Sequence, residues 1–166
     1  RMAAISAWFA KELGQTFPQQ LSIPLLLENE LRYGENSHQL AAVYKQAGAK
    51  GTSLVGAKQL NGKELSYNNL LDLDSALGIV RPMSQAACAV IKHNNPCGAA
   101  VGASLAEATR KALDGDPQSA FGGVLAMNQP IDAATAEVLC QPGLFIEAIV
   151  APSFDADALE MLKSKP

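Results

Sequence analysis

The sequence predicts an α/β fold with a largely parallel sheet covered by helices. Three short apolar runs, typical of buried strands, alternate with segments of helical periodicity. Because such alternation implies right-handed crossovers, successive strands are expected to run in the same direction. The chain of 166 residues is 48% hydrophobic and 17% charged, which suits one globular domain with a core and excludes a disordered chain.

The helices are predicted from apolar residues that recur on one face and from capping residues. The segment that runs from Ser66 has Asn68 and Asn69 at its start, whose side-chain oxygens can cap free N–H groups, and it stops before Pro82. A segment at the N-terminus is rich in good helix formers, and Asp132 is expected to cap a later helix. The predicted helices span residues 2–13, 66–80, 104–113, 132–139 and 155–163.

Strands are predicted where short apolar runs are bounded by turn-forming residues. The three runs that resemble buried strands are Ala86–Lys92, Gly123–Met127 and 145–150. Residues 21–27 are also apolar, but Pro24 limits them to an edge strand or an extended segment. Residues 14–20 are expected to form a connector, and the polar residues 31–39 a loop.

Charge, hydropathy and cysteine content narrow the class of protein. The net charge is −3, and no Lys/Arg cluster of the kind that neutralises phosphates is present, so nucleic acid is not an expected partner. No apolar run approaches the roughly 20 residues that span a bilayer, and no membrane association is expected. Cys88, Cys97 and Cys140 are an odd, scattered set, so a reducing, cytoplasmic location is expected.

The pair Lys92 and His93 is the leading candidate for chemistry. It ends a predicted strand and is followed by Asn-Asn-Pro-Cys-Gly. A histidine of tunable pKa beside a cation suits proton transfer combined with stabilisation of developing negative charge. The alternative is a solvated strand end with no function. Since successive strand residues point to opposite faces, both side chains serve one substrate only if the strand ends at about this point.

Several further residues are candidates for binding, and each has a plainer alternative. Gly122 precedes a predicted strand and leaves the backbone open to a ligand, although most such glycines only form turns. Glu147 lies within an apolar strand, so it either faces a cavity with a partner or lies at a solvated edge. In the polar loop, the guanidinium of Arg32 suits a phosphate or carboxylate, and Tyr33 lies beside it. The alternative for each is a surface residue without a role in binding.

Common cofactor and catalytic motifs are missing. The sequence contains no G-x-G-x-x-G, no G-x-x-x-x-G-K-[ST] and no G-x-S-x-G. A zinc deaminase would carry H-x-E followed by P-C-x-x-C. Here His93 is followed by two asparagines and Cys97 by Gly-Ala-Ala, so a zinc hydrolase of this type is not expected.

Five stretches resemble one known family in their order and approximate spacing. They are LRYGENSHQ, GKELSYNNLLDLDSAL, IKHNNPCGAA, DPQSAFGGVLAMN and FIEAIVAP. Together they are similar to the transformylase domain of the bifunctional purine-biosynthesis family that joins AICAR formyltransferase to IMP cyclohydrolase. The resemblance runs from about residue 31 to the C-terminus. It departs from the family at Ser37, where the family usually has proline.

The resemblance implies a reaction and a set of roles. The 5-amino group of AICAR takes a formyl group from 10-formyltetrahydrofolate, the co-substrate. The family's general base matches His93, and the lysine that stabilises its transition state matches Lys92. The residues that match the family's AICAR-binding positions are Arg32, Tyr33, Asn69, Gly122 and Glu147.

The resemblance also implies a fold and an organisation. The expected fold is cytidine-deaminase-like, with α/β/α layers, without zinc and repeated twice in the family's transformylase domain. Residues 1–16 are then a terminal helix and connector from the cyclohydrolase domain, and 17–166 an incomplete first unit. The full-length enzyme is expected to be a cytoplasmic homodimer, and this segment to be inactive alone. No monovalent cation is assigned. The alternative function is a non-catalytic nucleotide-binding module of the same fold.

Overall fold

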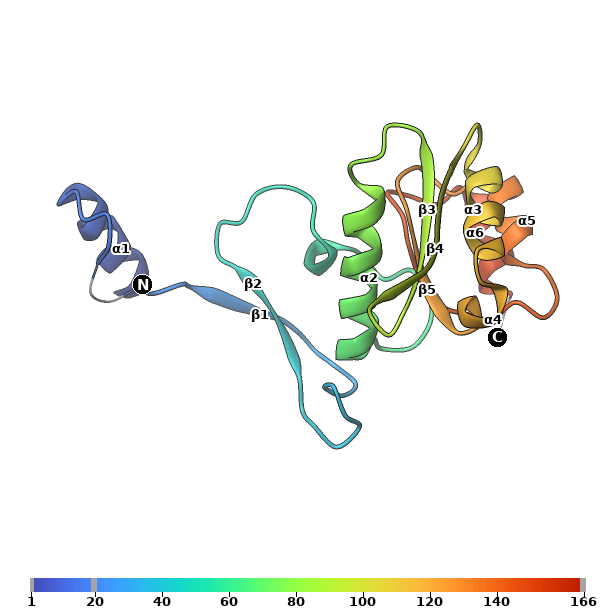
Figure 1. The fold of residues 1–166 in the computed structure, drawn as a ribbon. Helices are drawn as coiled ribbons and strands as arrows, with labels where there is room; N and C mark the ends of the chain where they lie inside the picture. The colour runs from blue at the N-terminus through green and yellow to red at the C-terminus, as the bar shows by residue number, and fades with distance from the viewer. Residues whose placement is uncertain (1, 19–20, 165–166) are drawn as a thin grey trace. The chain divides into compact units, whose positions relative to one another are not determined.

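The protein is described by a computed structural model that covers residues 2–18 and 21–164. The chain divides into two compact units (Figure 1), residues 1–59 (unit 1) and residues 60–166 (unit 2), which are described separately. The division at residue 16 that the sequence suggests concerns the domains of a longer protein and stays a prediction. No helix in the described ranges is long and apolar enough to cross a membrane.

The described residues of unit 1 form an α-helix, a β-hairpin and a short 3-10 helix. The predicted N-terminal helix is confirmed as α1 (Met2–Glu12), and none of its described residues is buried. The strand β1 (Leu25–Glu30) pairs antiparallel with β2 (Ala42–Gln46), and a short 3-10 helix, η1 (Leu54–Gly56), follows. Only the last part of the extended segment predicted at 21–27 belongs to β1, and β2 was not predicted. The loop predicted at 31–39 is confirmed, whereas Gln19 and Gln20 of the predicted connector lie outside the described residues.

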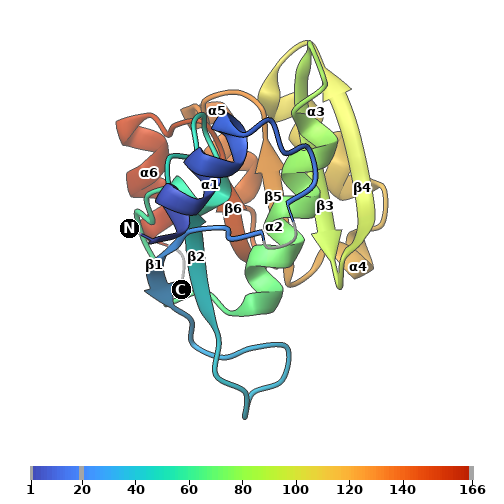
Figure 2. The same ribbon diagram turned by 90° about the vertical axis from the view of Figure 1, so that its left-hand side faces the viewer.

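Unit 2 is built on a four-stranded sheet in the order β4-β3-β5-β6, which Figure 2 shows from the face covered by α2. The predicted strands are confirmed as β3 (Ala86–Lys92), β5 (Gly123–Met127) and β6 (Ile146–Val150). The fourth strand, β4 (Asn95–Gly102), was not predicted, because a proline and two glycines interrupt its apolar pattern. As proline favours an edge strand, the position of β4 at the edge of the sheet accommodates Pro96.

The sheet is mixed, so the expectation of a largely parallel sheet was wrong. Strand β3 pairs antiparallel with both β4 and β5, and only β5 and β6 are parallel. The unpredicted strand explains the error. Because β4 folds back on β3 as a hairpin, the helical crossover that follows it brings β5 in parallel to β4 and therefore antiparallel to β3.

Helices cover both faces of this sheet, as Figure 1 shows. One face carries α2 (Tyr67–Val80), which contacts β3, β5 and β6. On the other face lie α3, α4, α5 and α6, which span Leu105–Asp114, Pro117–Ala120, Ala133–Leu139 and Ala156–Lys163. The helices predicted in unit 2 are confirmed to within about a residue, with Asp132 as the N-cap of α5, and α4 was not predicted.

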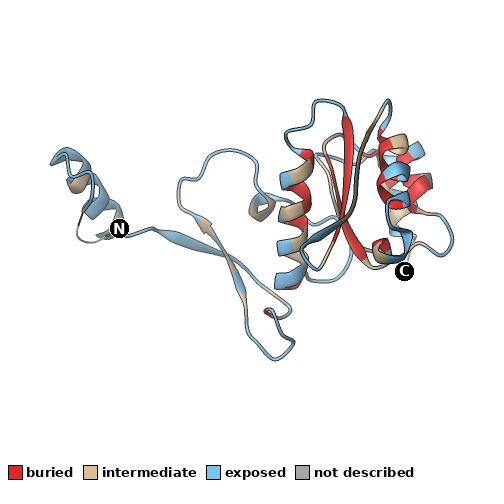
Figure 3. Ribbon diagram, viewed as in Figure 1, coloured by how far each residue is buried: buried red, intermediate tan, exposed pale blue. Residues whose placement is uncertain are grey.

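The core lies between the sheet and these helices. Six of the seven residues of β3 and all five of β5 are buried, and Figure 3 shows the buried residues concentrated in unit 2. A close contact between α3 and β4 depends on Gly98. A Cβ atom there would lie 2.0 Å from the carbonyl oxygen of Ala112, so only glycine lets the two backbones approach this closely.

Candidate active site at the end of β3

The candidate catalytic pair lies where β3 turns into β4. Lys92 is the last residue of β3 and pairs with Asn95, so His93 and Asn94 alone connect the two strands. Both connecting residues have positive φ, 53° for His93 and 60° for Asn94. Positive φ at both residues is a feature of type I′ turns, and histidine and asparagine are enriched among the non-glycine residues with positive φ. The strand therefore ends at Lys92, as a shared role of the two side chains requires.

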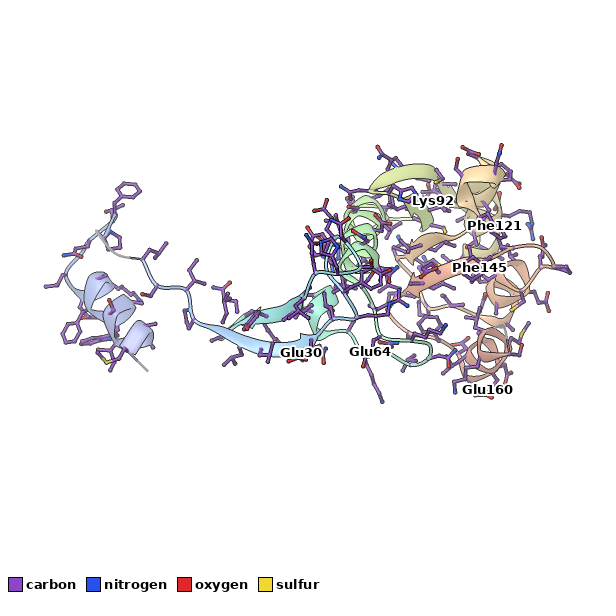
Figure 4. All side chains as sticks on the ribbon, turned by 90° about the horizontal axis from the view of Figure 1, so that it is seen from below. Glu30, Glu64, Lys92, Phe121, Phe145 and Glu160 are labelled. Atoms are coloured by element: carbon purple, nitrogen blue, oxygen red, sulfur yellow. The ribbon has the colours of Figure 1, made fainter. Side chains whose placement is uncertain are left out.

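The ammonium of Lys92 is held beside the start of β5. Its Nζ donates a hydrogen bond to the carbonyl oxygen of Phe121 at 2.7 Å. The N–H of Gly122 in turn donates to the carbonyl oxygen of Phe145 at 2.8 Å, and the two phenyl rings lie 5.6 Å apart. Figure 4 shows Lys92, Phe121 and Phe145 close together. The site thus joins the carboxyl end of β3 to the amino ends of β5 and β6.

Gly122 fits this arrangement because of its backbone conformation. Its φ is +72°, which residues with a Cβ rarely adopt, and a Cβ would lie 3.6 Å from the ring of Phe145. The conformation lets its N–H point at Phe145 while the preceding carbonyl accepts from Lys92. The glycine predicted to approach a ligand therefore lies directly beside the predicted catalytic lysine.

An open hollow of about 200 Å³ lies at this end of the sheet. Its electrostatics combine the Lys92 ammonium with the carboxylate of Asp116, whose Oδ1 accepts from the N–H of Ser119 at 3.0 Å. Hydrogen bonds from Ser119, with a smaller contribution from the charge of Lys92, hold the pKa of Asp116 below its ordinary value. Burial, reinforced by the charge of Asp116, raises the pKa of the Cys97 thiol. The hollow is lined by Lys92, His93, Asn95, Pro96, Cys97, Asp116 and Ser119.

The turn is attached to α2 through Asn94. The carboxylate of Asp72 accepts a hydrogen bond from the backbone N–H of Asn94 at 2.7 Å. The hydroxyl of Ser75 donates to the side-chain oxygen of Asn94. Asp72 and Ser75 are three residues apart, so they lie on one face of the helix. The position of His93 is therefore linked to a helix that also packs on β3 and β5.

Asn69 has a structural role at the start of α2. Its side-chain oxygen accepts from the N–H of Ser66 at 3.0 Å, while the Ser66 hydroxyl accepts from the N–H of Asn69 at 3.2 Å. This reciprocal capping box makes Ser66 the N-cap, whereas the sequence pointed to Asn68 and Asn69. Asn69 lies one turn before Asp72, on the side of α2 that faces the hairpin turn.

Glu147 lies at a bulge in the edge strand β6. The neighbouring residues Ile146 and Ala148 pair with Gly123 and Val124, which leaves Glu147 without a partner in the ladder. Its side chain is exposed, so of the two alternatives the solvated edge is the one that the structure of this chain supports. A bulge nevertheless re-aims a side chain, and this one lies at the same end of the sheet as Gly122.

Arg32 and Tyr33 belong to unit 1, in the loop of the first hairpin. The guanidinium of Arg32 donates to the hydroxyl of Tyr33 at 3.2 Å and lies 4.8 Å from the centre of its ring. The loop is closed by the N–H of Gly34, which donates to the carbonyl of Gln39 at 2.9 Å. The two residues that are predicted to bind the nucleotide are therefore in contact with each other.

The residues that hold the site together were not predicted from the sequence. Two signals for them are present in the sequence. An Asp followed by Pro marks the start of a helix, which is the role of Asp116 in α4. Asparagine tolerates the left-handed conformation that a two-residue turn requires, which is the role of Asn94. The missed residues are Asp72, Ser75, Asn94, Asp116, Ser119, Phe121 and Phe145.

No cluster of three or more His, Cys, Asp or Glu side chains that could bind a metal occurs within residues 2–18 and 21–164.

Comparison with known proteins identifies the family. The model of the AICARFT/IMPCHase bienzyme family matches residues 2–166. The chain belongs to this family.

Its relatives include the bifunctional purine biosynthesis protein PurH of three bacteria. The chain is 58% identical to that of Rhodopirellula baltica over 154 residues, which cover 93% of the chain and 29% of the relative. It is 48% identical to that of Myxococcus xanthus and 47% identical to that of Bacillus mycoides, each over 98% of the chain and 32% of the relative. The chain thus spans about a third of the length of these relatives.

Proposed function

We propose that this chain carries the Lys92–His93 part of an active site that transfers a formyl group from 10-formyltetrahydrofolate to AICAR. The observation that supports this most is the coincidence of the pair with a two-residue turn at one end of the sheet, in a chain of the AICARFT/IMPCHase family. A pure nucleotide-binding module has no need of a general base beside a fixed ammonium.

In the proposed reaction the 5-amino nitrogen of AICAR attacks the formyl carbon. The imidazole of His93 accepts the proton that this nitrogen loses. Lys92 stabilises the negative charge that develops on the formyl oxygen. The bond between the formyl carbon and N10 of the folate then breaks, N10 takes up a proton, and tetrahydrofolate and formylated AICAR are released. The hydrogen bond from Lys92 to Phe121 supports this role, because it limits the positions that the ammonium occupies.

The remaining predicted residues are proposed to bind AICAR. Arg32 suits the phosphate, because its planar guanidinium matches phosphate oxygens, and Tyr33 orients it through their hydrogen bond. Gly122 permits close approach by the ligand. Asn69 and Glu147 offer polar groups for the carboxamide or the amine. The side-chain oxygen of Asn69 already accepts from Ser66, which leaves its amide N–H groups as its donors to a ligand.

We further propose that unit 2 is part of the first of two cytidine-deaminase-like units. Its sheet, with helices on both faces, supports that layering. Residues 1–16 are assigned to the end of the cyclohydrolase domain. The whole enzyme is proposed to be a cytoplasmic homodimer, in which residues outside this chain complete the folate site.

The experiment that tests the function uses a full-length PurH protein that contains this segment. Lys92→Ala and His93→Ala are each expected to lower the rate of tetrahydrofolate formation by about 10²-fold or more, as loss of an acid–base or charge-stabilising group does. Lys111→Ala is the matched control. Lys111 lies on the exposed side of α3 in an ion pair with Glu107, and its loss should leave the rate unchanged. Near-normal turnover in both site variants would contradict the proposal.

A binding measurement separates the enzyme from the nucleotide-binding module. AICAR should raise the thermal stability of the full-length wild-type protein and of its His93→Ala variant to a similar degree, because the proposed base acts on the amine and not on the phosphate. The His93→Ala variant should lose formyl transfer, whereas the wild-type protein keeps it. Binding together with an undiminished rate in the variant would favour the module with a separate catalytic base.

A further inference from the structure

The turn that carries His93 has an unusual backbone. Both of its residues have positive φ, and neither is glycine. A left-handed conformation brings Cβ close to the following carbonyl oxygen, so L-residues adopt it only where local bonding supports it. Two-residue turns of this type usually contain Asn-Gly or Asp-Gly. The pair His93-Asn94 therefore depends more on its surroundings than a glycine-containing turn would.

The support comes from α2 and acts on the second residue of the turn. The carboxylate of Asp72 accepts from the backbone N–H of Asn94 at 2.7 Å, and the hydroxyl of Ser75 binds the Asn94 side chain. A third bond lies within the hairpin, where the side chain of Asn95 donates to the carbonyl oxygen of His93 at 2.9 Å. The bond from Asp72 is charge-assisted and acts on the main chain, so it restrains the backbone directly.

We propose that Asp72 is a positioning residue that holds the His93–Asn94 turn in its left-handed conformation, with Ser75 as its auxiliary. The proposal rests on the proposed function of His93 as the general base. The φ of a residue fixes the direction of its Cα–Cβ bond, so a turn that relaxes to negative φ would redirect the imidazole away from the hollow that it lines together with Lys92. Asp72 then contributes to catalysis without touching substrate.

The neighbouring acid on the same helix offers a matched control. Asp74 lies two residues after Asp72 and is exposed, whereas Asp72 is half-buried against the turn. Asp74→Ala removes the same charge from the same helix and should leave both the turn and the rate unchanged. Asp72→Asn is the conservative variant, because its side-chain oxygen still accepts the N–H of Asn94.

The first measurement does not depend on activity. In NMR spectra of the 166-residue chain, residues with positive φ give a strong intraresidue cross-peak between the amide proton and Hα. Asp72→Ala is expected to weaken this cross-peak for His93 and Asn94, whereas Asp72→Asn and Asp74→Ala keep it. Unchanged cross-peaks in Asp72→Ala, at unchanged thermal stability, would overturn the proposal even if His93 is the base.

The second measurement uses the full-length enzyme. Asp72→Ala is expected to lower kcat by about tenfold, with little change in the KM for AICAR. A misplacement of a catalytic group by about 1 Å is able to lower the rate by about 10²-fold, so a tenfold loss corresponds to a smaller displacement of His93. Asp72→Asn should restore most of kcat, which a change of net charge alone would not allow. A variant that loses kcat only in proportion to folded protein would show a merely structural role and overturn the proposal.

A double-variant cycle identifies the cause. Asn94→Gly places at position 94 the residue that adopts positive φ without strain. In this background Asp72→Ala should lower kcat by much less than it does alone, because the turn no longer needs the helix. An equal loss in both backgrounds would mean that Asp72 acts otherwise and would overturn the proposal. If His93→Ala keeps normal turnover, the proposed function fails, while the NMR measurement still decides whether Asp72 holds the turn.

Discussion

The two hairpins of this chain each carry predicted site residues, but they are stabilised in different ways. In the first hairpin every residue of β1 is exposed, and the loop with Arg32 and Tyr33 is closed by bonds among its own residues. In the second hairpin β3 is buried, and its turn is held by side chains of α2. The turn after Lys92 thus continues a buried strand and is bonded to a helix that is distant in sequence, whereas the bonds described for the Arg32–Tyr33 loop come from residues close to it in sequence.

The largest effect that tests this comparison is expected from truncating one apolar side chain in each hairpin. Ile91 of β3 is 1% exposed, so Ile91→Ala should lower the free energy of unfolding by about 2–5 kcal/mol. Leu26 of β1 is 61% exposed, and Leu26→Ala should change it by less than about 0.5 kcal/mol. Urea denaturation of the 166-residue chain measures both. Similar losses in the two variants would mean that the first hairpin is buried in solution.

A smaller effect sharpens the account of how β4 is held. Gly98→Ala should lower the free energy of unfolding by about 1–3 kcal/mol, because the new Cβ would meet the Ala112 carbonyl, a backbone atom that cannot turn aside. Gly78→Ala is the matched control. Gly78 is exposed in α2, and a Cβ added to it would meet no other part of the chain within 4 Å, so alanine should stabilise the helix by about 0.5–1 kcal/mol. Thermal unfolding measures both changes in stability. A loss in Gly98→Ala together with a gain in Gly78→Ala supports the close approach of α3 to β4, whereas unchanged stability in Gly98→Ala contradicts it.

Much of unit 2 could be predicted from sequence, because its buried strands are continuous apolar runs and its helices begin at clear caps. Ala86–Lys92 and Gly123–Met127 are found with the predicted bounds, and Asp132 caps α5 as expected. The strand β4 could not be predicted in this way. Its residues become a strand because β3 offers a partner and because Gly98 admits α3, and neither condition is visible in local pattern.

The missed strand also decides what could be predicted of the candidate site. In a parallel sheet Lys92, at the carboxyl end of β3, would lie at the opposite edge from Gly122, at the amino end of β5. The antiparallel pairing brings them to the same edge, where Lys92 binds the carbonyl of the residue before Gly122. Residue types thus suggested Lys92 and Gly122 as candidates, whereas their proximity depends on a strand direction that the unpredicted hairpin reverses.

The smallest effect concerns Asp116, which lies by the second hairpin. Its pKa is lowered first by hydrogen bonds from Ser119 and to a lesser degree by the charge of Lys92. Ser119→Ala removes the hydrogen bond from the Ser119 side chain, which is the largest cause, and keeps the one from the Ser119 N–H. It should therefore raise the pKa of Asp116 part of the way to its ordinary value, and Lys92→Ala should raise it by less. The carboxyl ¹³C shift of Asp116, followed by NMR during acid titration, measures both changes. A larger rise in Lys92→Ala would mean that the charge of Lys92, and not the side chain of Ser119, contributes most to the lowered pKa of this carboxylate.

The same shift has a consequence for stability at low pH. Because the folded-state pKa of Asp116 lies below the unfolded value of about 4, its ionised form stabilises the fold above that pH, and this contribution is lost as the pH falls through the folded pKa. Asp116→Asn keeps a capping oxygen but does not titrate, so its stability relative to wild type should improve as the pH falls below about 4. A difference that stays constant across this range would show that the α4 cap does not favour the ionised carboxylate.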